Sequence, residues 1–254
     1  MRLKPIGKQI IHFEAIQSTQ DVAIAEARQG KEEGIVFWAD EQKKGRGRWG
    51  RSWFSLPSKC LLFSFILRPK TPAKFISYLS LFPALACSFA IERYGVRCLL
   101  KWPNDILIEG KKAGGILVET EVVGDRIEWA VVGIGINVNL VEEEFPAELR
   151  ATATSLRIVL GKMLDIEGLL KDILRELNEW YEICFSEEGR EKIREEWEKR
   201  DFLRGKEIEV GFANGGKLKG IADGIDEMGY LRVRVGEGKI VLVSTGEVYL
   251  LEKI

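Results

Sequence analysis

The sequence predicts an α+β protein in which a mixed or antiparallel sheet is flanked by helices and followed by a small β-barrel. Four short β-rich runs, separated by Pro-Asn, Gly-Lys-Lys and Gly-Asp turns, stand between two helical regions. Beyond Gly205 the chain changes character, because alternating apolar and polar residues are punctuated by glycine. We therefore expect a larger domain over residues 1–203 and a β-barrel domain over residues 204–254.

The elements of the first half follow from helix caps and apolar runs. Ser18 stands at the N-cap position of a short helix, and Gly30 follows as its stop. The runs Gly34–Ala39 and Leu61–Leu67 predict strands, the second of them buried. The apolar stretch after Pro72 predicts a helix that reaches Tyr94.

The second half begins with the four β-rich runs that define the sheet. They are Val96–Lys101, Asp105–Ile108, Gly115–Glu119 and Trp129–Gly135. From Asp165 to about Arg200, apolar residues at helical spacing and Glu/Lys pairs predict two helices with a solvated outer face.

The composition excludes several classes of protein. Of the 254 residues, 46% are hydrophobic and 30% are charged, which allows a large core under a solvated surface and excludes a disordered or collagen-like chain. Lys plus Arg is 38 and Asp plus Glu is 39, so the formal charge of −1 gives no general attraction to nucleic acid or anionic membrane. Any anion site must be local.

The sequence also predicts a cytoplasmic protein without a membrane segment. The longest uncharged stretch, Phe75–Ile91, is shorter than the roughly 20 apolar residues that a membrane span needs, so we expect a buried helix there. The N-terminal residues Met1–Pro5 lack the apolar region of a secretory signal.

The cysteines and the single histidine do not suggest a metal site. Cys60, Cys87, Cys98 and Cys184 lie far apart and form no CxxC pair, which favours reduced, buried thiols. His12 alone cannot build a histidine-rich metal site, and Ser-His-Asp catalysis would depend on it entirely.

The region Gln42–Ser52, here called the arginine loop, is the strongest local signal. Arg46, Arg48 and Arg51 alternate with glycines, so fork-shaped donors for phosphate oxygens stand on a flexible backbone. We expect a long mobile loop that closes over a polyanionic ligand.

The arginine loop also matches patterns that point elsewhere. Gly45–Gly50 fits GxGxxG, and its extension through Ser52 is close to a P-loop. Both patterns need a following helix, whereas Trp53–Pro57 follows here. Binding of single-stranded nucleic acid through the arginines and Trp49 stays open as an alternative.

Two further segments combine turn chemistry with polar groups. Lys101–Asp105 presents a cation, an amide and a carboxylate across a tight turn, although a plain surface turn has the same composition. In Gly133–Asn139, glycines interrupt an apolar strand, which lets another group approach the backbone closely.

Taken together and in order, six segments resemble the biotin protein ligase family. They are Ser18–Gln20, Gln42 with Gly45–Arg51, Lys101–Asp105, Gly115–Glu119, Gly133–Asn137 and Ala153–Leu156. The resemblance continues into the tail with Gly224–Asp226 and Gly246–Val248, and it spans nearly the whole chain. It implies a class II synthetase-like catalytic domain and an SH3-like C-terminal barrel.

The resemblance implies a two-step reaction. Biotin and ATP with Mg²⁺ form biotinyl-5′-AMP and pyrophosphate, and a lysine of a biotin carboxyl carrier protein then takes the biotinyl group. Because the first step brings anions together, fixed cations and exclusion of water should supply most of the catalysis.

The resemblance also implies roles for residues of this chain. Lys101 and Arg48 would be catalytic. Biotin contacts would come from Ser18, Thr19, Gln20, Gln42, Arg46, Gly47, Arg48, Lys101 and Gly115. ATP contacts would come from Arg48, Arg51, Trp53, Asn104 and Asn137, with Mg²⁺ near Asn104 and Asp105. Gln20 departs from the family, which usually has Asn at that position.

The resemblance further implies a homodimer. Because the first motif begins at Ser18, we expect a ligase without the N-terminal DNA-binding domain that some members carry. The alternative enzyme is a lipoate ligase-type acyl transferase, which shares the fold class. The alternative without catalysis is a single-stranded nucleic-acid-binding protein.

Overall fold

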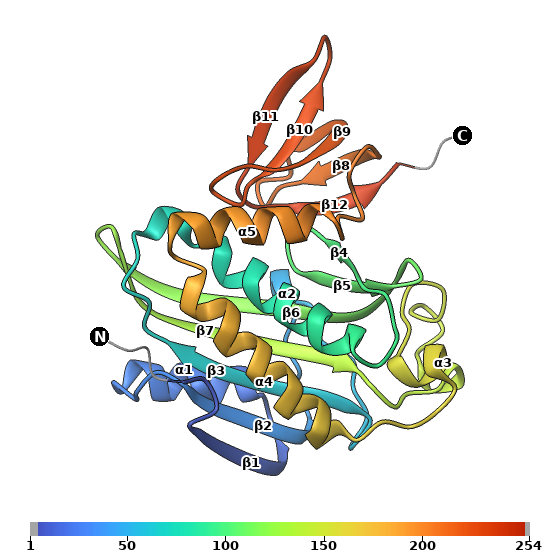
Figure 1. Ribbon diagram of the computed structural model, residues 1–254. Coiled ribbons are helices and arrows are strands. Elements are labelled where there is room, and N and C mark those ends of the chain that lie inside the picture. The colour runs from blue at the N-terminus through green and yellow to red at the C-terminus, as the bar shows by residue number, and fades with distance from the viewer. Residues whose placement is uncertain (1–4, 252–254) are drawn as a thin grey trace.

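The computed structural model describes residues 5–251, and its main sheet has seven strands (Figure 1). They are β1 Gln9–Ile16, β2 Ile35–Gln42, β3 Cys60–Leu67, β4 Leu99–Lys101, β5 Asp105–Ile108, β6 Lys111–Val123 and β7 Arg126–Asn137. Their order is β1-β2-β3-β7-β6-β5-β4. Only β1 and β2 are parallel neighbours, so the predicted mixed sheet is confirmed.

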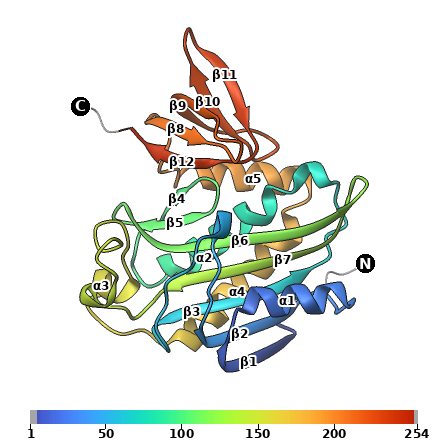
Figure 2. The same ribbon diagram turned by 180° about the vertical axis from the view of Figure 1, so that it is seen from behind.

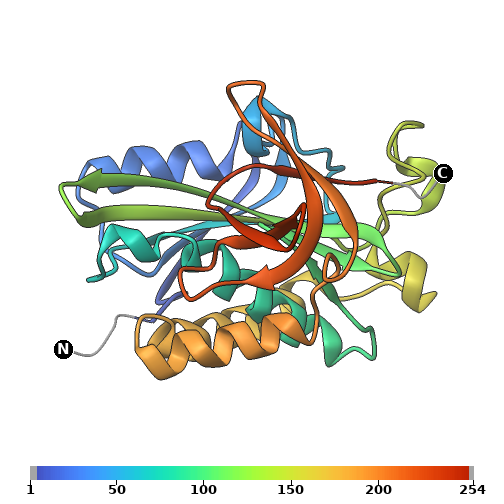
Figure 3. The same cartoon turned by 90° about the horizontal axis from the view of Figure 1, so that it is seen from above.

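Helices cover both faces of this sheet, which explains why every residue of the central strand β3 is buried. The helices of the described chain are α1 Thr19–Arg28, α2 Tyr78–Glu92, α3 Leu156–Leu160, α4 Ile166–Ile183 and α5 Glu187–Glu198. In Figure 2, α1 lies on the face turned toward the viewer. Seen from above, α1 and the α4–α5 pair lie on opposite sides of the sheet (Figure 3). The sheet is therefore the middle layer of the larger domain.

Helix α2 is the core helix that the sequence predicts. By length and apolarity the segment Ala73–Glu92 could also cross a membrane, but 67% of it is buried inside the protein. The side chains of Tyr78, Leu81 and Phe82 are fully covered by the sheet and by the neighbouring helices. The segment thus packs as a core element.

The second sheet lies above α5 (Figure 1). It consists of β8 Glu207–Gly211, β9 Lys217–Ile225, β10 Leu231–Val235, β11 Lys239–Val243 and β12 Glu247–Leu250, in the order β11-β10-β9-β8-β12. The edge strands β11 and β12 are not paired with each other in the described residues, so the small SH3-like domain is an open sheet rather than the closed barrel we expected.

Two side chains of the larger domain attach the second sheet. Trp102 donates its indole N–H to the carbonyl of Gly229 at 3.1 Å, and Tyr78 donates its hydroxyl to the carbonyl of Glu227 at 3.0 Å. Gly229 has φ of 75°, and a Cβ there would lie 2.7 Å from Leu81. The domains therefore meet through close backbone contact.

The structure adds elements that the sequence did not predict, among them the edge strand β1, the short helix α3 and the last strand β12. The predicted buried thiols are confirmed: all four cysteines are free and buried. Burial raises the pKa of the Cys60 and Cys98 thiols to about 12, which makes them inert at neutral pH. Residues 1–4, on which the signal prediction partly rests, lie outside the described residues.

Candidate functional site

A cavity of about 350 Å³ opens where α1, the arginine loop, the central strands and β12 meet. This volume is typical of a small-molecule site. The cavity gathers the predicted site residues Ser18, Thr19, Gln20, Gln42, Arg46, Gly47, Arg48, Arg51, Trp53, Lys101, Asn104, Asp105 and Gly115. Segments that are far apart in the sequence thus form one site.

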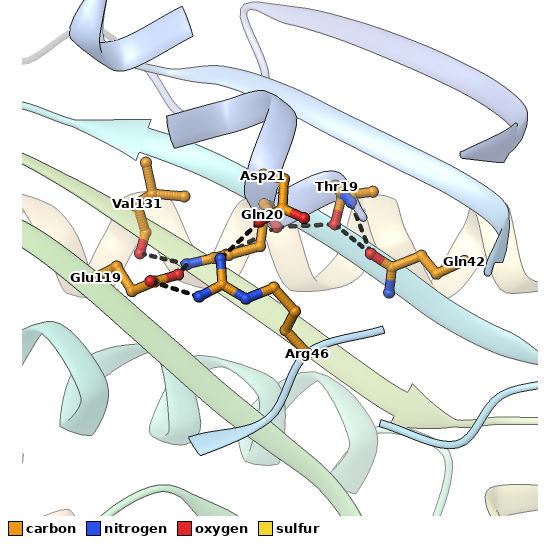
Figure 4. A network of polar contacts seen from close by, with 8 residues as sticks. Thr19, Gln20, Asp21, Gln42, Arg46, Glu119 and Val131 are labelled. Atoms are coloured by element: carbon orange, nitrogen blue, oxygen red, sulfur yellow. Dashed lines mark hydrogen bonds and ion pairs between the residues drawn. The ribbon is translucent and has the colours of Figure 1, made fainter. Parts of the chain in front are cut away.

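One side of the cavity, here called the polar end, consists of Ser18, Thr19, Gln20, Gln42 and Ser64. The Oε1 atom of Gln42 accepts from the Thr19 backbone N–H at 2.7 Å and from the Thr19 hydroxyl at 3.0 Å (Figure 4). The Thr19 hydroxyl also lies 2.8 Å from that of Ser64. The Ser18 hydroxyl is buried and has no hydrogen-bond partner within residues 5–251, which leaves it available to a ligand.

Gln20 fills the space over Gly133. Its Oε1 accepts from the Ser64 hydroxyl at 3.1 Å, and its Nε2 donates to Glu119 at 3.1 Å and to the Val131 carbonyl at 3.3 Å. A Cβ on Gly133 would lie 2.4 Å from that Oε1 atom. The longer amide is therefore accommodated by a glycine, and its polar atoms bond within the protein.

The arginine loop is ordered over the cavity by its own backbone and by carboxylates. Gly47 N–H donates to the Arg51 carbonyl at 2.7 Å, and Trp49 adopts a left-handed backbone with φ of 59°. Arg46 forms ion pairs with Asp21 at 2.6 Å and Glu119 at 2.8 Å. Burial lowers the pKa of Arg46, but the hydrogen bonds to these carboxylates outweigh it and the net pKa is raised.

The opposite side, here called the cationic end, consists of Arg48, Lys101 and Lys112. Burial lowers the pKa of Lys101 below its usual value, and the positive charge of Lys112 lowers it further, against the opposing effect of Asp105. Burial likewise lowers the pKa of Arg48. No carboxylate of residues 5–251 forms an ion pair with Arg48 or Lys101, so this end has positive charge to offer to an anion.

Trp53 lies flat against the glycines of the central strands. A Cβ on Gly135 would lie 2.7 Å from its indole ring, and one on Gly115 would lie 3.5 Å away. Lys112 stands 5.6 Å from the ring centre and pairs with Asp105 at 2.5 Å. These contacts explain the glycines that interrupt the apolar strand, as the sequence predicted.

The second sheet completes the cavity with residues that sequence reasoning missed. Both terminal nitrogens of Arg51 bond to the Glu247 carboxylate, and Nη2 does so at 2.7 Å. Arg48 donates to the Gly246 carbonyl at 3.2 Å. Lys112 and Ser64 were also missed. A lone hydroxyl in an apolar strand was the signal for Ser64, and the Gly-Lys-Lys turn was the signal for Lys112.

Two residues lie outside the cavity: Asn137, which the resemblance assigned to ATP, and His12, which was considered for catalysis. Asn137 is 4% exposed and donates its amide to the Thr154 carbonyl at 3.0 Å, so it braces the end of β7. His12 lies on the edge strand β1, and its ring stacks on that of Trp38 with 4.2 Å between the ring centroids. Its Nε2 atom lies 3.0 Å from a carboxylate oxygen of Asp40. Within residues 5–251 no group of three or more His, Cys, Asp or Glu side chains could hold a metal ion.

Comparison with known proteins identifies two family matches. Residues 12–137 match the Biotin/lipoate A/B protein ligase family, and residues 204–251 match the Biotin protein ligase C terminal domain. The bifunctional ligase/repressor BirA of Bacillus subtilis is 36% identical over 246 residues, which cover 94% of this chain and 73% of that protein. The biotin--[acetyl-CoA-carboxylase] ligase of Mycobacterium tuberculosis is 31% identical, covering 91% of this chain and 85% of that protein.

A solved structure is similar along nearly the whole chain. The biotin protein ligase from Aquifex aeolicus, in complex with biotin and ATP, superposes with a TM-score of 0.82 at 32% identity. The match covers 97% of this chain and all of that chain. The similarity therefore includes both sheets.

Proposed function

We propose that the cavity of this chain, which belongs to the biotin protein ligase family, activates biotin with ATP. The biotinyl group then passes to a lysine of a biotin carboxyl carrier protein. One observation carries the proposal. Arg48 and Lys101 place unneutralised positive charge at one end of a cavity whose other end offers neutral hydrogen-bonding groups. A ligand with a polar uncharged head and an acid group fits that division.

The first step suits these residues. A carboxylate oxygen of biotin attacks the α-phosphorus of ATP, the bond to the β-phosphate oxygen breaks, and pyrophosphate leaves with that bond's electron pair. Negative charge grows on the phosphate oxygens during the attack, and preorganised cations at Lys101 and Arg48 stabilise it. In the second step a carrier lysine amine attacks the acyl carbon and AMP leaves.

The remaining residues divide between the two substrates. The polar end supplies neutral donors and acceptors for the ring of biotin, and the flat indole of Trp53 offers a stacking surface for adenine. Mg²⁺ would arrive on the ATP phosphates, and Asp105, which lines the cavity, would be a carboxylate to hold it, because a magnesium ion on a nucleotide needs only one or two protein ligands. Homodimerisation and cytoplasmic location stay predictions.

Nucleic-acid binding is the weaker candidate. In the arginine loop, the guanidinium groups of Arg46 and Arg51 are each paired with carboxylates. This pairing reduces the positive charge that a nucleic-acid phosphate backbone would meet.

Exchange of labelled pyrophosphate into ATP tests the function. We expect exchange that requires biotin and is not supported by lipoate. The Lys171→Ala variant serves as a control, because Lys171 pairs with Glu167 on the exposed side of α4, and it should exchange at the wild-type rate. Exchange with lipoate alone would replace this proposal with the lipoate alternative.

A further inference from the structure

We propose that Asp21 and Glu119 are positioning residues that clasp Arg46 and thereby hold the arginine loop over the cavity, with Gln20 bracing Glu119. The consequence of this clasp, the retention of the activated biotin, rests on the proposed function. The clasp itself is a property of the protein without ligands. Neither carboxylate belongs to the residues assigned above to biotin or ATP.

The clasp joins three separate elements through one guanidinium group. Asp21 lies in the first turn of α1, Glu119 lies on β6, and Arg46 reaches between them from the loop (Figure 4). Each terminal nitrogen of Arg46 bonds to a different carboxylate, at 2.6 Å and 2.8 Å. Because the carboxylates approach from two sides, Arg46 is fixed in orientation as well as in position.

Gln20 connects this clasp to the polar end. One carboxylate oxygen of Glu119 bonds to Arg46 while the other accepts from Gln20 Nε2. The Gln20 Oε1 atom accepts from Ser64, whose hydroxyl meets that of Thr19. The Thr19 backbone N–H in turn donates to Gln42, the residue at which the arginine loop begins. A continuous chain of hydrogen bonds therefore joins the base of the loop to its clasp.

The identity of residue 20 matters for this chain of bonds. Gln20 is 3% exposed and spans from Ser64 to Glu119 across the space that Gly133 leaves open. An asparagine at this position is one methylene shorter and could not keep both contacts. Gln20 thus gives Glu119 a fixed partner.

The strength of the clasp suits a loop that has to open again. The side chains of Arg46 and Glu119 are about one-third exposed and that of Asp21 is half exposed. Ion pairs with such exposure shift an equilibrium by only about 2- to 5-fold each. A closed loop keeps water from the mixed anhydride of biotinyl-AMP, whose hydrolysis yields biotin and AMP. The carrier lysine still gains access when the loop opens.

The lifetime of bound biotinyl-AMP tests the clasp. The enzyme is loaded with biotin and α-labelled ATP, chased with unlabelled ATP, and sampled for intact adenylate. We expect Glu119→Gln and Asp21→Asn each to shorten that lifetime about 2- to 5-fold, the double variant to shorten it further, and Gln20→Asn to reproduce part of the Glu119→Gln effect. Raising the salt concentration should shorten the wild-type lifetime more than that of the double variant.

A second measurement works without substrates. Trypsin cleaves after arginines, so the rate of cleavage within Arg46–Arg51 in the ligand-free protein reports how often the loop opens. We expect faster cleavage in the clasp variants than in wild type. The Glu167→Gln variant, which loses a more exposed ion pair with Lys171 on α4, away from the loop, should match wild type in both measurements.

The outcomes separate the clasp from the function. Wild-type lifetimes and wild-type cleavage in Glu119→Gln and Asp21→Asn would overturn the clasp, even if biotin-dependent exchange is robust. Absence of any biotin adenylate in wild type would overturn the function, while the cleavage rates would still decide the clasp. Thermal unfolding midpoints are measured alongside, because a general loss of stability would accelerate cleavage throughout the chain and not only in the loop.

Discussion

The polar end and the cationic end of the cavity satisfy their polar groups in opposite ways. At the polar end, Thr19, Gln20 and Gln42 bond to neighbouring protein groups, and the Ser18 hydroxyl alone has no partner within residues 5–251. At the cationic end, Arg48 and Lys101 have lowered pKa values and no carboxylate partner among those residues. One end is prepared before a ligand arrives, whereas the other gains its counter-charge from the ligand.

This difference separates binding from catalysis. Hydrogen-bonding groups that are already fixed in place contribute equally to substrate and transition state, so they mainly set KM. Unneutralised cations interact most strongly when negative charge develops, so they mainly set kcat. The predictions below test that division, beginning with the cationic end.

Lys101→Ala should have the largest effect. Loss of a preorganised cation at the reacting phosphate is expected to reduce kcat of biotin activation about 10²- to 10³-fold, with a smaller change in KM. Pyrophosphate exchange measures it, and Lys171→Ala is the control for loss of a lysine elsewhere. Near-normal turnover in Lys101→Ala would break the comparison, because the cationic end would then have no catalytic role.

The pH dependence of exchange should report the same lysine. Because burial lowers the pKa of Lys101 from its usual 10.5, its ammonium loses its proton at a lower pH than that of an ordinary lysine in the free enzyme. We expect kcat/KM to fall about tenfold per pH unit above that lowered pKa. An alkaline limb at or above pH 10.5 would assign the limb to another group.

Gly135→Ala should weaken ATP binding about tenfold. The added Cβ would lie 2.7 Å from the Trp53 indole. The indole must then move away from the position in which we propose that it stacks on adenine. The readout is the KM for ATP with the KM for biotin as an internal reference. Gly211→Ala is the matched control, because its Cβ meets its nearest neighbour at an ordinary 3.6 Å. An unchanged KM for ATP would remove Trp53 from the nucleotide site.

Thr19→Val should have the smallest effect and should act on KM alone. The substitution keeps the shape of the side chain but removes the hydroxyl that bonds to Gln42 and Ser64. We expect the KM for biotin to rise about 3- to 10-fold at nearly constant kcat. Thr152→Val, at an exposed threonine outside the cavity, serves as the control. A fall in kcat instead would show that the polar end also acts in the transition state.

Most of the fold could be predicted because its elements carry local signals. Strand β3 is an apolar run broken only by Ser64, and α2 is a long and mostly apolar helix, so each is recognisable without its neighbours. Strand β1 was missed because it lies at the sheet edge, where most of its residues are not fully buried, and it pairs with a distant segment through contacts such as Gln9 with Ile35. Such pairing is not encoded in local periodicity.

Most residues of the site could be predicted from the sequence, but their contacts with one another could not. The motifs placed Lys101 and Arg48 in one cavity, as the structure shows. The arginines of the loop all suggested phosphate binding, yet Arg46 pairs with Asp21 and Glu119. Those pairings depend on how α1 and β6 meet across the sheet, and the sequence pattern of the loop contains no information about that.

The attachment of the second sheet has a consequence for how the protein unfolds. Trp102 adjoins Lys101 in the chain, and its indole is bonded to Gly229 at the far side of the domain junction. Loss of the small domain would leave that N–H and the Tyr78 hydroxyl without acceptors in an uncovered apolar wall. We therefore expect the two sheets to melt in a single cooperative transition, with the smaller one acting as a part of the enzyme's core instead of an exchangeable module.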